Sequence, residues 1–97
     1  MTINKNQNGS ALTVALEGRL DTSTAPQLEA DLAGLPGVTE LTMNFEKLEY
    51  ISSAGLRVLL SAQKIMNKQG KMVITNVNDT IQEVFEITGF SDILTIE

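Results

Sequence analysis

Apolar and polar residues alternate in the first part of this chain, as they do in a strand with one covered face. The alternating positions within residues 11–20 are Leu12, Val14, Leu16, Gly18 and Leu20. A weaker strand over residues 2–5 is expected to pair with this one, because Asn8-Gly9 between them is a strong hairpin signal. The pattern therefore predicts an antiparallel hairpin at the start of the chain.

Three further strands are expected later in the sequence. The same alternation predicts one strand over residues 41–45. Residues 71–75 follow Gly70 as the next strand, and residues 92–96 form a short terminal one. These segments are separated by stretches with helical spacing, so the strands and helices should alternate along the chain.

The first helix is predicted to begin after Thr24, which is expected to form a capping box with Gln27, and to end near Gly34 and Pro36. Pro26 suits the first turn of such a helix. Its apolar side, at positions i, i+4 and i+7, consists of Leu28, Leu32 and Leu35.

A second helix is predicted over residues 53–69, with Gly70 at its C-terminal end. A third helix begins near Asn78-Asp79 and stops at Gly89, with Phe90 folding back on Phe85. One side of the third helix is lined by Ile81, Val84, Phe85 and Thr88.

The element order is β-β-α-β-α-β-α-β, which predicts an α/β fold in a single domain of residues 1–97. Strands joined through helices are expected to be parallel, so the sheet is mixed. Clean alternation in the strands indicates that helices cover mainly one face of this sheet.

The apolar side of the second helix is broad. It comprises Val58, Leu59, Ala62, Ile65 and Met66, with Leu56 and Leu60 at its edges. Most of this arc should be core. Because the arc exceeds what one sheet face needs, an apolar margin is expected to meet a partner.

Ser52 and Ser53 stand where an extended segment becomes a helix, and three roles are open to Ser53. A nucleophile elbow needs G-x-S-x-G, but position 51 is Ile, and neither Lys64 nor Lys68 has S-x-x-K spacing from Ser53. A helix cap is the simplest role. A phosphoacceptor is the third, because a phosphate at a helix N-terminus is favourable and Arg57 lies one turn on.

Composition removes several other functions. The chain has no histidine and no cysteine, which excludes a Ser-His-Asp triad and thiolate chemistry and fits a reducing cytoplasm. A net charge of −5 disfavours nucleic acid as a partner. No apolar run is long enough to insert into a membrane, and no acidic motif has calcium-loop spacing, so no metal site is expected.

The ordered set of motifs resembles a STAS domain of the anti-sigma factor antagonist type, over essentially the full chain. The first matching block is Leu16-Glu17-Gly18-Arg19-Leu20-Asp21, before a helix that opens with Thr24-Ala25. The second is Tyr50-Ile51-Ser52-Ser53-Ala54-Gly55-Leu56, in which Ser52 stands where many family members carry Asp. Gly70 to Ile74 and the pair Gly89-Phe90 match the family's later pattern.

The resemblance implies a cytoplasmic partner-switching regulator of transcription that is not an enzyme and needs no cofactor. In this family the serine aligned with Ser53 is phosphorylated by the anti-sigma factor, which is also a serine kinase, and a PP2C-type phosphatase removes the phosphate. The unmodified antagonist binds the anti-sigma factor and is released on phosphorylation. The residues expected at the partner surface are Asp21, Thr22, Ser23, Ser52, Ser53, Gly55 and Arg57.

Other STAS domains are interaction modules that do not switch, for example in lipid-transport complexes. An unphosphorylated module of this kind is therefore the alternative function. The sequence leaves open which of the two applies, and which sigma factor the switch would serve.

Overall fold

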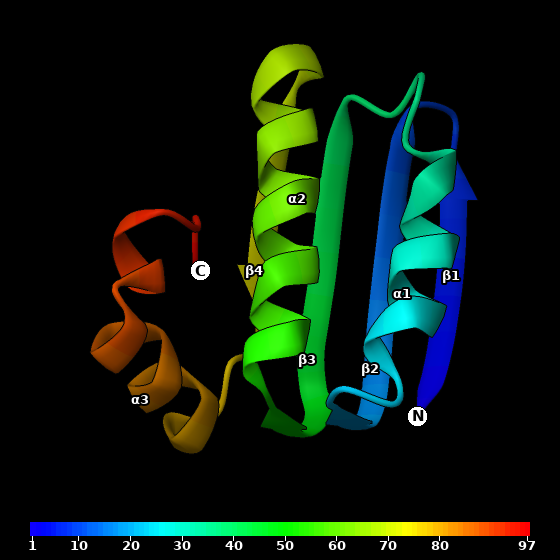
Figure 1. Ribbon diagram of the computed structural model, residues 1–97. Coiled ribbons are helices and arrows are strands. Elements are labelled where there is room, and N and C mark those ends of the chain that lie inside the picture. The colour runs from blue at the N-terminus through cyan, green and yellow to red at the C-terminus, as the bar shows by residue number, and fades with distance from the viewer.

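A computed structural model describes residues 1–97, apart from the surroundings of Gly34. Its longer elements follow one another as an alternation of strands and helices (Figure 1). They are β1 (Thr2–Asn8), β2 (Ala11–Leu20), α1 (Ala25–Asp31), β3 (Glu40–Ile51), α2 (Ser53–Gln69), β4 (Lys71–Thr75) and α3 (Asp79–Thr88). Two short 3₁₀ helices, η1 (Leu32–Gly34) and η2 (Phe90–Asp92), follow α1 and α3.

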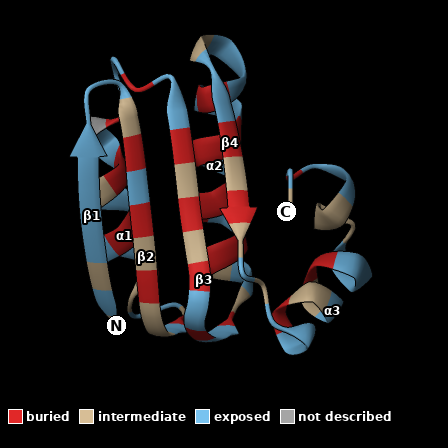
Figure 2. Cartoon of the chain, turned by 180° about the vertical axis from the view of Figure 1, so that it is seen from behind, coloured by how far each residue is buried: buried red, intermediate tan, exposed pale blue. Residues whose placement is uncertain are grey.

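The strands form one mixed sheet in the order β1-β2-β3-β4. The hairpin partners β1 and β2 are antiparallel, whereas β2, β3 and β4 run parallel because a helix connects each to the next. Helices α1 and α2 cover one face, the opposite face is open, and α3 lies beside the sheet (Figures 1 and 2). The predicted α/β class, with helices mainly on one face, is confirmed.

The hairpin turn lies at the predicted place, with Gly9 in the left-handed region at φ 64°. β1 continues to Asn8, three residues beyond its predicted end, and β2 has the predicted limits. The register between β2 and β3 shifts twice, and at each shift the additional residue lies on β3, between Asn44 and Lys47 and between Leu48 and Tyr50. β3 is therefore bulged, and its burial stops alternating after Phe45, where the predicted strand ended, although the strand continues to Ile51.

The predicted terminal strand over residues 92–96 is wrong as a strand. Asp92 belongs to η2, and only Ile96 bridges to β4, in a parallel pair with Ile74. The backbone N–H groups of Ile74 and Glu97 donate to the carbonyls of Thr95 and Ile74 at 2.9 Å each. This short pairing still covers part of the β4 edge.

The predicted limits of α2 are confirmed at both ends, and α3 begins and ends at the predicted residues. The predicted capping box at Thr24 is wrong, because the Thr24 hydroxyl makes no cap bond to α1. It donates instead to the Arg19 carbonyl at 2.8 Å. The carbonyl of Asp21 accepts from the N–H groups of Thr24 and Ala25 and so replaces the cap.

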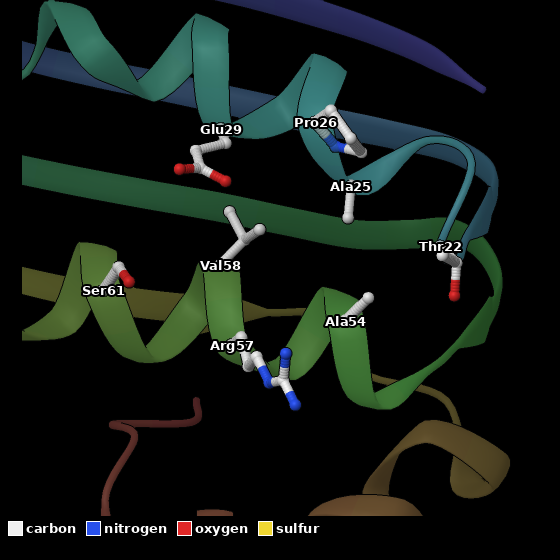
Figure 3. Close-up of a pocket in the computed structure, with 8 residues that line it drawn as sticks. All are labelled: Thr22, Ala25, Pro26, Glu29, Ala54, Arg57, Val58 and Ser61. Atoms are coloured by element: carbon white, nitrogen blue, oxygen red, sulfur yellow. The ribbon is translucent and has the colours of Figure 1, made fainter.

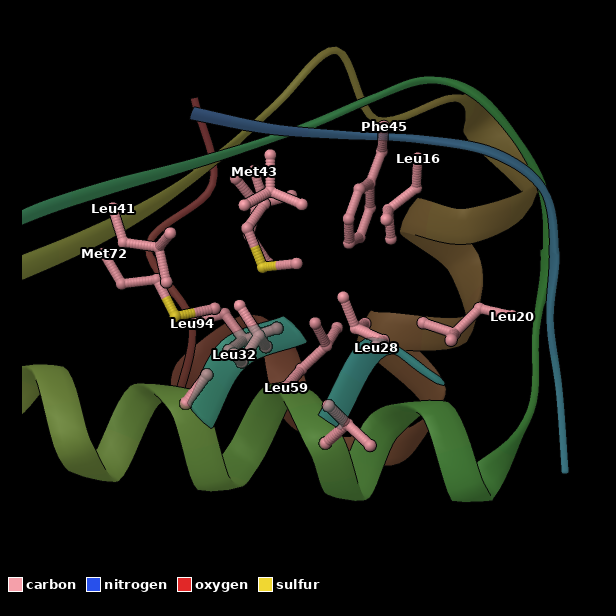
Figure 4. Close-up of a cluster of buried hydrophobic side chains, with 14 of the residues drawn as sticks. Leu16, Leu20, Leu28, Leu32, Leu41, Met43, Phe45, Leu59, Met72 and Leu94 are labelled. Atoms are coloured by element: carbon pink, nitrogen blue, oxygen red, sulfur yellow. The ribbon is translucent and has the colours of Figure 1, made fainter. Parts of the chain in front are cut away.

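The core lies between the sheet and its two covering helices (Figure 4). Leu28, Leu32 and Leu35, the predicted apolar side of the first helix, are all buried. Phe85 of α3 packs against Phe45 of β3, with ring centroids 6.4 Å apart. α3 is thereby attached to the sheet by its buried side, on which Ile81 and Phe85 have no exposed area.

Candidate functional site

The carboxyl ends of β2 and β3 bring the two motif blocks of the sequence together. These strands are parallel, and Leu20 is paired with Ile51 at their ends. The N–H of Ser52 donates to the Leu20 carbonyl at 2.9 Å. The loop that starts at Asp21 and the N-terminus of α2 are therefore neighbours, although they are far apart in the sequence.

The two adjacent serines have different environments. Ser52 is half-buried and is the N-cap of α2, where its side-chain oxygen accepts from the N–H of Gly55 at 3.4 Å. Ser53 is the first helical residue and is exposed. Among the hydrogen bonds between described residues, none involves the Ser53 hydroxyl. Of the two serines, Ser53 is the one that presents a free hydroxyl to solvent.

The Asp21 carboxylate is held in place by its own loop. Its Oδ1 accepts from the Ser23 hydroxyl at 2.7 Å, from the Ser23 N–H at 3.0 Å and from the Thr24 N–H at 3.2 Å. The hydroxyl bond from Ser23 is the main reason that the pKa of Asp21 lies below its ordinary value, and the backbone bonds act in the same direction. Asp21 is thus a fixed negative charge beside the start of α2.

Arg19 borders this loop on the strand side. Its guanidinium lies 4.2 Å above the ring centroid of Tyr50, and its Nε is 3.8 Å from Oδ2 of Asp21. Both contacts are exposed, so their net contribution to stability is small. They nevertheless orient a cation and an aromatic ring at the edge of the site.

Gly55 has a different place from the other predicted partner-surface residues. It is buried, and a Cβ there would lie 2.7 Å from Cγ of Leu20 and 3.0 Å from Cγ1 of Ile51. Gly55 therefore allows α2 to approach the ends of β2 and β3 closely. Its contribution to the site is packing, not direct contact at the surface.

A hollow of about 330 Å³ opens beside this site, between α1 and α2 (Figure 3). It begins at Thr22 in the loop and at Ala54 and Arg57 in the first turns of α2. The rest of its lining is Ala25, Pro26, Glu29, Val58 and Ser61. Arg57 is exposed, and its side chain extends along the outer side of α2 (Figure 3).

The structure thus brings together six of the seven predicted surface residues at one end of the molecule. These are Asp21, Thr22, Ser23, Ser52, Ser53 and Arg57. The sequence reasoning missed Glu29 and Ser61, which line the hollow from facing helices. Their only signal in the sequence was a position on the polar side of a helix, and that is shared by many solvated residues.

Among the described residues, no three acidic side chains gather closely enough to hold a metal ion.

No helix in the described part of the chain has both the length and the apolar character needed to cross a bilayer.

Comparison with known proteins gives a consistent result. The family model of the STAS domain matches residues 2–97. BtrV of Bordetella bronchiseptica, whose name assigns it to the anti-sigma factor antagonists, is 40% identical over 88% of this chain and 76% of its own length. The anti-sigma-B factor antagonist of Staphylococcus aureus is 34% identical over 84% of this chain and 78% of its own length.

Among solved structures, the fold is similar to that of the Bacillus cell fate determinant SpoIIAA in its phosphorylated form. The TM-score is 0.77, with 21% identity, and the alignment covers 99% of this chain and 91% of SpoIIAA. At that identity the likeness supports the fold, whereas the relatives of higher identity bear on the family.

Proposed function

This chain belongs to the STAS domain family, among the anti-sigma factor antagonists, and we propose that it is a partner-switching regulator controlled at Ser53. In its unmodified form it binds an anti-sigma factor and so frees a sigma factor. Phosphorylation of Ser53 releases it. Residues 1–97 act in this role as one domain, in the cytoplasm.

The observation that carries this proposal is the separation of roles between the two serines. Ser52 caps α2 and is half-buried, whereas Ser53 is exposed and its hydroxyl is free to react. A phosphate on Ser53 would lie at the N-terminus of a 17-residue helix, where the helix dipole favours negative charge. Arg57, four residues on, has the spacing of an ion-pair partner.

The effect of the phosphate would be electrostatic. It adds about −1.5 to −2 charges and three acceptor oxygens at neutral pH. Asp21, which is ionised at neutral pH and whose pKa is lowered further by its hydrogen bonds, stands at the neighbouring strand end. A partner surface that accommodates the neutral hydroxyl would then face a concentrated negative charge, and desolvating that charge would weaken the complex.

We infer that the partners, and not this chain, catalyse the addition and removal of the phosphate. We infer that the anti-sigma factor is the serine kinase and that a PP2C-type phosphatase restores the free hydroxyl. The chain offers neither histidine nor cysteine as an activating group for Ser53. It is therefore a substrate of both reactions and has no turnover of its own.

One observation favours a second function, that of an interaction module that is never phosphorylated. Ser52 occupies the position at which many family members carry an acidic residue, so the kinase would lack that carboxylate next to the acceptor. In such a module the same surface would bind its partner constitutively.

Mass spectrometry distinguishes the two functions. The purified chain is incubated with ATP and the anti-sigma factor kinase of the same genome. We expect one phosphate per chain in the wild type and in Ser52→Ala, and none in Ser53→Ala. Loss of the label in Ser52→Ala alone would assign the phosphate to Ser52, and a wild type that is never labelled would favour the constitutive module.

A further inference from the structure

A second hollow, of about 230 Å³, continues the first one along α1 and α2. The two hollows share Glu29, Val58 and Ser61 in their lining. They therefore form one groove, here called the α1–α2 groove, which begins at Thr22 and Ala54 beside the phosphoacceptor. The residues added at its far end are Leu32, Ala33, Ala62 and Ile65.

The far part of the α1–α2 groove is mostly apolar, whereas the part beside Ser53 has a mixed lining. Val58 and Ala62 of α2 and Leu32 at the end of α1 are buried core residues whose surfaces form its floor. Ile65 forms its rim and keeps 43% of its surface exposed, although it belongs to the apolar arc of α2. Ile65 therefore extends the apolar floor of the far hollow onto the exposed surface of α2.

One charged side chain lies in the middle of the groove. Glu29 lines both hollows, is exposed, and forms no ion pair with any described residue. An apolar segment entering the groove would meet this carboxylate, and the complementary group is a lysine or arginine of the partner.

The proposed phosphoacceptor surface is too small to bind a protein by itself. A stable interface takes about 800 Å² and roughly 20 residues from each partner. Ser53, Arg57 and the loop of residues 21–23 are only five residues. The interface must extend from the end of α2, and the groove is the apolar surface that begins there.

We propose that the α1–α2 groove binds an amphipathic helix of the anti-sigma factor, with large apolar side chains in the hollows and a basic residue facing Glu29. Two neighbouring helices present the kind of groove into which the ridges of a third helix pack. This inference rests on the proposed function, because the partner is the same. It assigns the contact energy to the groove and the regulation to Ser53.

Calorimetry with the purified anti-sigma factor of the same genome tests this assignment. Ser61→Trp fills the groove from an exposed position, Ile65→Ala removes its apolar rim, and Glu29→Lys reverses its charge. Ser61→Trp should lower the affinity at least roughly tenfold, as truncation or blocking of a central contact does. Ile65→Ala and Glu29→Lys should each weaken binding, and the loss for Glu29→Lys should shrink as salt rises.

Two matched controls lie on α3, away from the groove. Ile87 is 76% exposed, so Ile87→Ala matches Ile65→Ala. Glu83 is an exposed helical glutamate, so Glu83→Lys matches Glu29→Lys. Both controls should bind like the wild type, and thermal melts of every variant should show a folded protein.

The outcomes separate the groove from the switch. If folded Ser61→Trp, Ile65→Ala and Glu29→Lys all bind like the wild type while Ser53→Asp binds weakly, the groove assignment is overturned and the proposed function stands. If the wild type does not bind the anti-sigma factor, both fall together. Sedimentation covers the remaining outcome. If the wild type is a dimer, Ser61→Trp is a monomer and its affinity for the anti-sigma factor is unchanged, the groove binds a second copy of the chain and the assignment to the anti-sigma factor is overturned.

Discussion

At the scale of single residues, two neighbouring serines have different roles because their backbone conformations differ. Ser52 and Ser53 are of the same residue type. The sequence predicted that the helix begins at Ser53, and the family resemblance implied Ser53 as the phosphoacceptor, but which serine caps the helix was left open. Their roles differ because Ser52 has extended dihedral angles, φ −102° and ψ 176°, which turn its oxygen back to the helix. Ser53 is already helical and exposed.

This difference predicts unequal effects of two alanine substitutions on stability. Ser52→Ala removes the cap and should lower the free energy of unfolding by about 0.5–1 kcal/mol, at the lower end for caps because the bond to Gly55 is long. Ser53→Ala should change stability by less than about 0.5 kcal/mol. Urea unfolding measures both, and equal losses in the two variants would contradict the assignment of the cap.

The loop at Asp21 predicts a dependence on pH. Because its folded pKa is lowered, Asp21 stabilises the fold above its unfolded pKa of about 3.9, and that contribution is lost as pH falls through the folded pKa. Ser23→Ala removes the hydroxyl bond and should raise the pKa of Asp21 towards its ordinary value. Carbon-detected NMR titration of the carboxyl measures this. Thr22→Ala, in the same loop but without a bond to Asp21, should leave the pKa unchanged.

Gln63 is a polar residue on the buried side of α2, with 6% of its surface exposed. Its Nε2 donates to Asn67 at 2.8 Å, but its buried Oε1 has no partner among the described groups. Removing a buried acceptor without a partner relieves more free energy than the lost bond supplies. Gln63→Met should therefore raise the free energy of unfolding by about 1 kcal/mol in urea titrations, whereas Gln63→Glu should lower it.

At the scale of elements, the sequence predicted what depends on local patterns. The limits of α2, of β4 and of α3 were read correctly because glycines and polar caps mark their ends. The bulges of β3 and the reduction of residues 92–96 to a single bridge depend on pairing between distant strands, which no local pattern records. The α1–α2 groove could not be predicted from the sequence either, because it forms only when two helices lie on the same face of the sheet.

Gly70, between α2 and β4, tests how closely the elements approach. Its φ of 174° is ordinary extended backbone, so its requirement is steric. A Cβ there would lie 1.9 Å from the carbonyl oxygen of Thr39, which also accepts the N–H of Lys71 at 3.0 Å. Gly70→Ala should destabilise the fold by about 3 kcal/mol, the upper end for overpacking, since backbone must move.

Thermal and urea unfolding of Gly70→Ala measure this cost. Gly9→Ala serves as a comparison with open space around its Cβ, where only the left-handed φ of 64° is strained. That variant should lose about 1 kcal/mol. A Gly70→Ala protein as stable as the wild type would show that the end of α2 is not pressed against Thr39.

At the scale of the whole molecule, the fold divides the surface into parts with separate roles. The covered sheet face and its helices hold the core, and the carboxyl ends of the parallel strands gather the loop at Asp21 and the start of α2. Ser53 at this end is exposed, so a charge added to its side chain faces solvent and does not enter the apolar core. The molecule can therefore change its binding surface without changing its fold.

The last prediction concerns that surface as a unit. Ser53→Asp introduces a carboxylate at the start of α2, near the ionised Asp21, although one carboxylate only partly mimics a phosphate. An unpaired charge at an interface commonly costs about 2–5 kcal/mol, which is roughly a 30- to 5000-fold loss of affinity for the anti-sigma factor. The fold should be retained or slightly stabilised, by about 0.3–1 kcal/mol, because an acid at a helix N-terminus is favourable. Calorimetry and thermal melts measure the two effects separately, with Ser53→Ala as the neutral control. Unchanged affinity in a correctly folded Ser53→Asp protein would favour the constitutive module over the switch.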